Sequence, residues 1–167
     1  MATEPGPILR PAEPGELAAL LGLYAAAVRS QCTGLYSPRQ VEAWAGHGQP
    51  EGAVAATIDR GFTLVNPVAP GDERLAAFAV LDPADRLALL YCDGRWSRQG
   101  RAAALVRALE QRARQQGVRQ LRTEASQLSR PLLLRLGWQI EACETVPYAG
   151  VLFERWRMIR ALTAGHG

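Results

Sequence analysis

The chain contains 167 residues, of which 48% are apolar and 21% are charged. This length and composition predict a single globular domain over residues 1–167 and exclude a largely disordered chain. The longest apolar stretches are interrupted by Arg or Asp, so the sequence predicts no membrane partner. Met1–Arg10 lacks the basic start and apolar run of a signal peptide, which favours a cytoplasmic location.

The charge balance argues against a nucleic-acid-binding protein, and the cysteine spacing argues against a protein stabilised by disulfides or a metal. The 19 basic residues are all arginine, but 16 acidic residues reduce the net charge to +3, which predicts no nucleic-acid partner. Cys32, Cys92 and Cys143 are widely spaced, and His47 and His166 are the only histidines. These spacings indicate neither a disulfide framework nor a metal site.

The first third of the chain predicts one short strand and three helices. Pro7–Pro11 is short and apolar enough for the strand. From Glu16 to Arg29, apolar residues recur at spacings of three and four, which predicts an amphipathic helix. The Ser-Pro-Arg-Gln sequence at 37–40 begins a second helix, with a capping serine followed by proline at the first helical position. A third helix is predicted over 51–60 and ends at Gly61.

In the middle of the chain the apolar pattern changes to that of strands. Short apolar runs at 62–65, 75–81 and 87–92 are separated by Pro, Gly and Asp, and they predict three antiparallel strands. Residues 100–116 return to helical spacing, and 118–125 again has the pattern of a strand. This region therefore predicts a strand, helix, strand unit with a parallel pair.

The last part of the chain predicts a short helix and a hairpin. The helix covers 128–136, and the hairpin joins 138–146 to 151–162 around a turn at 147–150. The whole chain thus predicts an α/β fold with a mixed sheet. The exposed edge of a terminal hairpin leaves pairing into a homodimer open.

A polar, glycine-containing loop joins the predicted strand 87–92 to the helix 100–116. It places the unpaired N–H groups of a helix start close to Arg95, Arg98 and Arg101. A phosphate group is a natural ligand of such a loop. The alternative is an ordinary strand-to-helix turn with solvated arginines.

The segment Ser97-Arg98-Gln99-Gly100-Arg101-Ala102 resembles the phosphate loop of the GNAT superfamily of acetyl-CoA-dependent N-acetyltransferases, R/Q-x-x-G-x-G/A. Gly100 and Ala102 fit this pattern, whereas Ser97 replaces its first Arg or Gln. Further segments are similar to the family in the same order: Ile8–Leu17 to its opening strand and helix, and Tyr36–Ala45, Glu124–Ser126, Arg130-Pro131 and Arg135–Trp138 to segments of one bacterial branch.

The resemblance implies a mixed, mostly antiparallel sheet with a splayed parallel pair, flanked by helices, and acetyl-CoA as co-substrate. The strands that end at Cys92 and near Ala125 would part around the pantetheine arm. The backbone of Tyr91 and Cys92 would bond the acetyl carbonyl and the pantetheine. The phosphate loop would hold the pyrophosphate through Arg98, Gln99, Gly100, Arg101, Ala102 and Ala103.

Acetyl transfer to an amine needs a base for the amine proton and a donor for the leaving thiolate. Relatives often carry a tyrosine donor at the position of Leu133, so Tyr91, Tyr148 or a water would have to replace it here. Glu124, at the end of the strand 118–125, is the best candidate for the base. The alternative for Glu124 is a salt-bridged carboxylate that supports the strand end.

The remaining candidates have ordinary structural alternatives. Asp82 better fits a turn residue, and Asp93 better fits a residue that caps the loop. Cys92 could form an acyl-enzyme, but no histidine lies within motif distance, and inert packing is favoured. Tyr36 and Trp44 could line the acceptor pocket, although Trp44 could equally pack against the sheet.

These observations predict an N-acetyltransferase that moves acetyl from acetyl-CoA to a primary amine of a small molecule or peptide by direct attack. The alternative is an acyl-CoA-binding module that has lost catalysis. Ser97 and Leu133, which replace two polar family residues, motivate that alternative.

Overall fold

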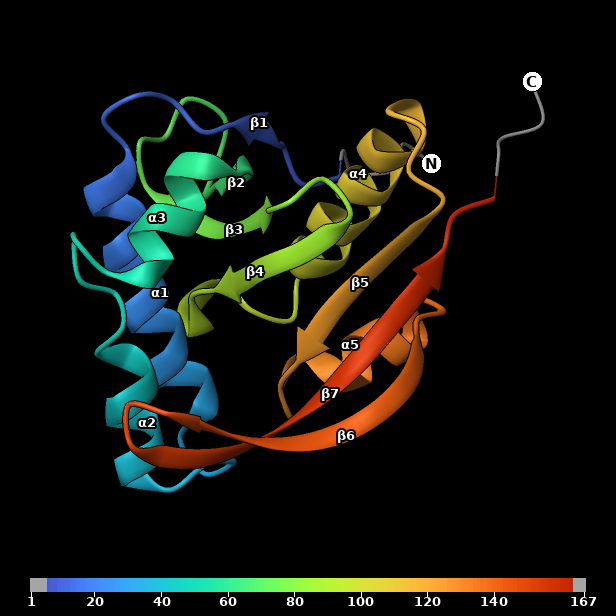
Figure 1. Ribbon diagram of the computed structural model, residues 1–167. Coiled ribbons are helices and arrows are strands. Elements are labelled where there is room, and N and C mark those ends of the chain that lie inside the picture. Colours follow the sequence, from blue (N-terminus) through green and yellow to red (C-terminus); the bar gives the residue numbers. More distant parts are fainter. Residues whose placement is uncertain (1–5, 164–167) are drawn as a thin grey trace.

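The fold comes from a computed structural model and is described for residues 6–163, so His166 lies outside the described residues. Figure 1 shows the elements in chain order. The helices are α1 (Leu17–Cys32), α2 (Pro38–Ala45), α3 (Ala53–Arg60), the 3-10 helix η1 (Gly94–Trp96), α4 (Arg101–Gln115) and α5 (Ser129–Arg135). The strands are β1 (Arg10–Pro11), β2 (Phe62–Pro67), β3 (Leu75–Leu81), β4 (Arg86–Cys92), β5 (Gln120–Ala125), β6 (Gln139–Tyr148) and β7 (Val151–Ala161).

The predicted elements are present, with some boundaries shifted. The strand expected at Pro7–Pro11 is reduced to Arg10–Pro11, which pair with Val65 and Leu64, whereas the Ile8 carbonyl accepts from the Asn66 side-chain amide instead. The first helix extends past Arg29 to Cys32. At the start of α2, the Ser37 hydroxyl accepts from the Gln40 N–H, and the Gln40 side chain accepts from the Ser37 N–H. The capping signal in the sequence is thereby confirmed.

The strands of the described residues form one sheet in the order β1-β2-β3-β4-β5-β7-β6. All neighbours are antiparallel except β4 and β5. That parallel pair is joined only at Arg86 with Arg122 and at Leu87 with Thr123. Figure 1 shows the two strands diverging beyond these residues. The predicted mixed sheet with a splayed parallel pair is confirmed.

Two local features mark the point where the strands part. The Thr123 hydroxyl donates to the Leu87 carbonyl at 2.6 Å and closes the end of the short ladder. On the other side of β4, Val80 pairs with Leu89 and Leu81 pairs with Leu87, which leaves Ala88 as a bulge. A bulge bends its strand and increases the local twist, so it favours the divergence of β4 from β5.

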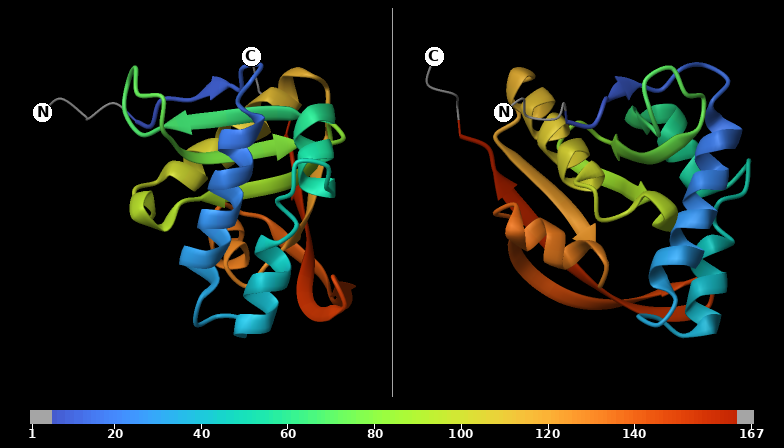
Figure 2. Two further views of the ribbon diagram at one scale, coloured as in Figure 1. Left: turned by 90° about the vertical axis from the view of Figure 1, so that its left-hand side faces the viewer. Right: turned by 180° about the vertical axis from the view of Figure 1, so that it is seen from behind.

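Each face of the sheet packs against its own helices. On β3, Phe78 and Val80 belong to the core beneath α1 and α3, whereas Ala77 and Ala79 belong to the core beneath α4. Alternate strand residues point to opposite faces, so both faces of this strand are apolar. Figure 2 shows α1 and α4 on opposite sides of the sheet.

The β6–β7 hairpin runs across the splayed region to α2 (Figure 1). Its turn is fastened there by the Gln40 side-chain amide, which donates to the Leu152 carbonyl at 2.9 Å. Phe153 of β7 also packs in the same core as α1 and α2. The hairpin therefore connects the C-terminal half of the sheet to the N-terminal helices. None of the helices in the described part of the chain is long and apolar enough to cross a membrane.

A buried carboxylate connects α4 to the C-terminal strands. Glu110 is 4% exposed and accepts from the Trp138 indole N–H at 3.0 Å. The Nε atom of Arg160, on β7, lies 3.6 Å from the same carboxylate. Removing a buried charged group leaves its buried partners without a hydrogen-bond or charge partner. The cost in folding free energy is larger than that of breaking an exposed ion pair.

Glu110→Ala is therefore expected to lower the free energy of unfolding by about 2 to 3 kcal/mol, because Trp138 and Arg160 lose their shared acceptor. Chemical denaturation followed by circular dichroism measures this change. The control is Glu144→Ala, which breaks the more exposed Glu144–Arg155 pair (2.6 Å) and should cost less than about 1 kcal/mol. Equal losses in the two variants would contradict the prediction.

Candidate active site

A cavity of about 580 Å³ lies where β4 and β5 diverge, and we call it the first cavity. Its walls come from the second half of α1, β4, the loop and first turns of α4, the end of β5, and α5. The predicted cofactor residues that line it are Tyr91, Cys92, Arg98, Gly100, Arg101, Ala102 and Ala103. Gln99 belongs to the same loop but is not among the lining residues.

The loop before α4 has the backbone geometry of an anion site. Gly100, the residue that precedes α4, has φ 78° and ψ 8°, and Arg98 has φ 60°. No side chain caps this helix, so the N–H groups of Arg101, Ala102 and Ala103 have no partner inside it. These groups and the helix dipole favour an anion at this end of the first cavity.

Two of the three loop arginines are held by the protein itself. Arg95 donates to the Asp93 carboxylate at 2.9 Å, and its guanidinium lowers the pKa of that carboxyl. Arg101 donates to the Asn66 side-chain oxygen at 2.7 Å and to the Val68 carbonyl at 3.3 Å. The Arg101 guanidinium thus fastens the loop to the end of β2, and its contribution to an anion site comes from the backbone. Asp93 caps η1, as expected.

Three other arginines line the first cavity and are exposed, namely Arg98, Arg107 and Arg135. Glu124 is the one acidic residue among the lining residues. The excess of cationic side chains favours an anionic ligand. Arg107 was not predicted, although it lies seven residues after Gly100, which is two helical turns along one face of α4.

The wall supplied by α5 is apolar. Leu133 is 1% exposed and lines the first cavity together with Leu132 and Leu136. The position at which the family resemblance implies a tyrosine donor is therefore a buried hydrocarbon surface here. It can contact the uncharged arm of a ligand but cannot transfer a proton.

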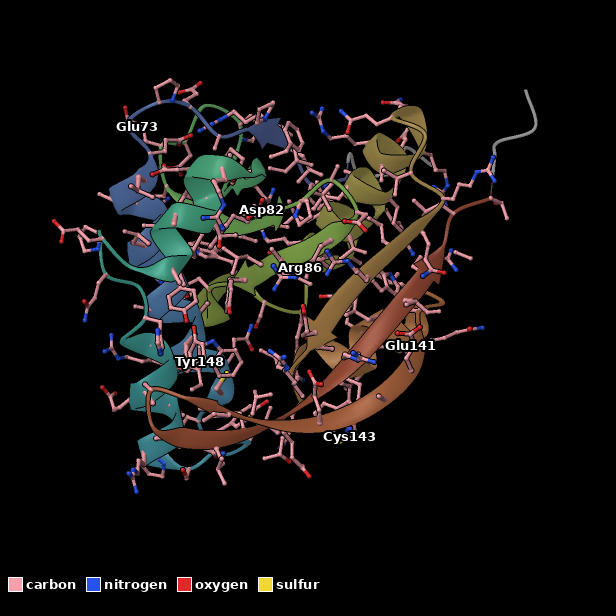
Figure 3. All side chains as sticks on the ribbon, viewed as in Figure 1. Glu73, Asp82, Arg86, Glu141, Cys143 and Tyr148 are labelled. Atoms are coloured by element: carbon pink, nitrogen blue, oxygen red, sulfur yellow. The ribbon has the colours of Figure 1, made fainter. Side chains whose placement is uncertain are left out.

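A second cavity, of about 300 Å³, lies on the side of the sheet that carries α2 and α3. Aromatic side chains from several elements line it: Tyr36, Trp44, Tyr91, Tyr148 and Phe153. The predicted acceptor residues Tyr36 and Trp44 are brought together, with their rings perpendicular and 5.3 Å apart. Figure 3 shows Tyr148 beside these N-terminal helices, near the turn of the hairpin.

The two cavities share six lining residues, which we call the junction: Trp44, Ala88, Leu89, Tyr91, Glu124 and Ser126. The junction lies at the β4 bulge and at the end of β5, where the strands part. A group bound in one cavity can meet a group bound in the other only at this place.

Glu124, the predicted base, lies at the junction and is paired with Arg86. The Arg86 Nε donates to the Glu124 carboxylate at 3.0 Å, and both side chains are partly exposed. Figure 3 shows Arg86 at the β4 end that faces β5. The salt-bridged alternative is therefore present, and the same carboxylate also lines both cavities.

Tyr91, the other predicted catalytic residue, points its ring toward α1 and α2. Its hydroxyl accepts from the Trp44 indole N–H at 3.1 Å, and its ring packs edge-on against Tyr24 at 4.7 Å. Burial raises the pKa of Tyr91 well above its ordinary value. The Tyr24 hydroxyl in turn donates to the Trp44 carbonyl at 2.7 Å.

The thiols near the first cavity are protonated at neutral pH. Burial raises the pKa of Cys92 to about 11 and that of Cys32 to about 12. The Cys92 sulfur lies near the Asp93 and Trp96 carbonyls, at 3.5 and 3.7 Å. Since the thiolate is the nucleophilic form, this environment does not activate Cys92. Within residues 6–163, no group of three or more His, Cys, Asp or Glu could hold a metal ion.

The divided sheet thus carries an uncapped helix start on one side and an aromatic cavity on the other. Residues 32–159 match the model of a protein family described as "Acetyltransferase (GNAT) domain". The chain belongs to this GNAT acetyltransferase family. No curated protein matches the sequence.

Solved structures show the same fold. A GCN5-related N-acetyltransferase from Rhodopseudomonas palustris is 25% identical, with a TM-score of 0.88 over 97% of this chain and 99% of that one. The PaiA N-acetyltransferase from Thermoplasma acidophilum, solved with coenzyme A, is 16% identical (TM-score 0.70, 92% and 98% covered). A phosphinothricin acetyltransferase from Sinorhizobium meliloti, in complex with AcCoA, is 17% identical (TM-score 0.66, 96% and 90% covered).

Proposed function

We propose that the protein is an N-acetyltransferase that moves acetyl from acetyl-CoA to a primary amine by direct attack. The observation that carries this proposal is the pair of cavities that meet at the junction. One cavity has the charge and backbone geometry for an anionic cofactor, and the other is aromatic and balanced in charge. Two bound substrates can therefore react without a covalent enzyme intermediate.

Acetyl-CoA is assigned to the first cavity. The N–H groups at the start of α4, with Arg98 and Arg107, would hold the phosphates, and the leucines of α5 would contact the pantetheine arm. Two structural relatives were solved with coenzyme A or AcCoA, which supports an acyl-CoA ligand. The thioester would then lie at the junction.

The acceptor is assigned to the second cavity. Its two arginines are already paired, Arg86 with Glu124 at 3.0 Å and Arg155 with Glu144 at 2.6 Å, so neither is free for a substrate carboxylate. Glu154, which also lines this cavity, is not in any of the salt bridges found among residues 6–163. This lining favours an amine with an aromatic or apolar body over an amino acid.

In the reaction, the neutral amine nitrogen attacks the thioester carbon, the C–N bond forms, and the C–S bond breaks. Glu124, which lines both cavities, would accept the amine proton, directly or through a water. The protonated state of Cys92 supports direct attack rather than an acyl-enzyme.

The test is release of free CoA from acetyl-CoA with phenethylamine, hexylamine, spermidine and glycine, alongside calorimetric binding of acetyl-CoA. We expect phenethylamine to have the highest kcat/KM, at least about tenfold above glycine, because only its ring can contact the aromatic wall. Acetyl-CoA binding without turnover on any amine would instead identify a binding module. Turnover that favours glycine would contradict the acceptor assignment alone.

A further inference from the structure

The leaving group of this reaction is the CoA thiolate, and a proton donor at the junction would stabilise its departure. The surface that α5 presents to the first cavity is hydrocarbon, including Leu133. The four tyrosines of the chain are therefore the side chains to compare. Their hydroxyl groups differ in where they point and in what they bond.

Two of the tyrosine hydroxyls are directed to Trp44, on α2. Tyr24 donates to the Trp44 carbonyl, and Tyr91 accepts from the Trp44 indole N–H. Tyr148 lies at the end of β6, with its ring centroid 3.7 Å from that of His47. Burial raises the pKa of all three phenols.

Tyr36 is placed differently, because its hydroxyl reaches the end of β5. It accepts a hydrogen bond from the Gln127 N–H at 2.8 Å, immediately after Ser126 of the junction. At its other end, the Tyr36 N–H donates to the carbonyl of Cys32, a residue of the first cavity, at 3.0 Å. The side chain is 7% exposed and lines the second cavity. Like the Tyr91 hydroxyl, this hydroxyl accepts but does not donate in the hydrogen bonds of residues 6–163; unlike it, it lies at the end of β5.

We propose that Tyr36 donates the proton that the CoA sulfur takes up when the C–S bond breaks. The proposal rests on the proposed function, since it presumes that acetyl-CoA is cleaved at the junction. It gives Tyr36, a residue of the α1–α2 connection, the donor role that the apolar side chain of Leu133 cannot fill.

The proton and electron balance is complete. The amine nitrogen bonds the acetyl carbon and gives one proton to Glu124 or a water, and the C–S electron pair moves to sulfur. The Tyr36 O–H proton passes to that sulfur and yields the free thiol. The Tyr36 phenolate regains a proton from Glu124 through water, so both residues return to their starting states.

The surroundings of Tyr36 raise the pKa of its phenol overall, so the hydroxyl is protonated before the reaction, as a donor must be. Burial raises the pKa of the phenol, but the Gln127 N–H, the Ser126 hydroxyl and the Arg130 charge act in the opposite direction. Cys32, on α1, is the other titratable group that faces it, and it is protonated at neutral pH. Trp44 and Phe153 complete the contacts without adding a charge.

Tyr36→Phe is expected to lower kcat about 10- to 100-fold, with the KM values for acetyl-CoA and the amine within about twofold of wild type. This loss lies at or below the low end of the rate effects known for general acids. The reason is that the CoA thiolate is a weak base and can leave even without a proton donor. The matched control is Tyr24→Phe, which removes the hydroxyl of another buried tyrosine that lines neither cavity and should keep kcat near wild type. Circular dichroism melts and calorimetric CoA binding verify that both variants fold.

A second measurement separates proton donation from positioning. A fluorinated tyrosine at position 36 keeps the shape of the ring but has a more acidic phenol. Because the donor must be protonated, the fall in kcat at high pH should then begin at lower pH, and fluorination of Tyr24 should not move it. Full activity of Tyr36→Phe, or a pH profile unchanged by fluorination, would overturn the role of Tyr36. A wild-type protein that is inactive with every amine would overturn the proposed function as well.

Discussion

Gly100→Val is expected to weaken acetyl-CoA binding by at least about 100-fold, equivalent to about 2.7 kcal/mol. A side chain built at Gly100 meets no atom of the protein within 4 Å, so it would project into the space where the phosphates are expected. The positive φ of 78° also disfavours a β-branched residue. Both effects act at the N–H groups that form the anion site, and calorimetry with acetyl-CoA measures the loss.

Gly117 supplies a matched control at the opposite end of α4. Its φ is 80°, and a side chain built there also meets nothing within 4 Å. Gly117→Val should therefore lower the free energy of unfolding about as much as Gly100→Val, roughly 1 to 2 kcal/mol. It should leave acetyl-CoA binding unchanged. If both variants lose affinity equally, the effect is global and the phosphates are not held at Gly100.

Glu124→Gln is expected to lower kcat by about 10²- to 10³-fold with the best amine, because the amide cannot accept the amine proton. The amide oxygen can still accept from the Arg86 Nε, so the contact between β4 and β5 is kept. The KM for acetyl-CoA should change little. Steady-state kinetics with saturating acetyl-CoA measures the effect.

The neighbouring ion pair between the same two segments is the control. Asp85 accepts from the Arg122 Nε at 3.3 Å, and both side chains are about half exposed, at 49% and 48%. Neither residue lines a cavity. Asp85→Asn should leave kcat near wild type. Unchanged turnover in Glu124→Gln would reduce Glu124 to a structural partner of Arg86.

Elements with strong local signals were predicted well from the sequence. The serine, proline and glutamine at 37–40 mark the start of α2 within four residues. Gly100 marks the start of α4, because glycine readily adopts the positive φ found there. The parallel pair followed from the strand, helix, strand pattern, whereas its splaying followed from the family resemblance. The limit of this approach appeared at β1, where the apolar run 7–11 pairs in the sheet only at Arg10 and Pro11.

The arrangement of side chains within the site could not be predicted in the same way. Tyr36 and Gln127 are separated by 91 residues, and Arg86 and Glu124 by 38. Such pairs are fixed by how the strands and helices pack, which no periodicity within a short window records. The Arg101 guanidinium is a further example, because its binding to Asn66 depends on β2 ending beside the loop. The catalytic roles of Tyr91 and Glu124 stay predictions.

The position of β7 between β5 and β6 has a consequence for biosynthesis. Although β7 follows β6 in the sequence, it is an interior strand of the sheet, and within residues 6–163 β6 is attached to the sheet only through β7. Phe153 on β7 also completes the aromatic wall of the second cavity. A nascent chain that ends before Val151 thus contains every residue of the phosphate loop but has an open, unpaired edge at β5. Until residues 151–161 are made, neither the β5 edge of the sheet nor the aromatic wall of the second cavity is complete.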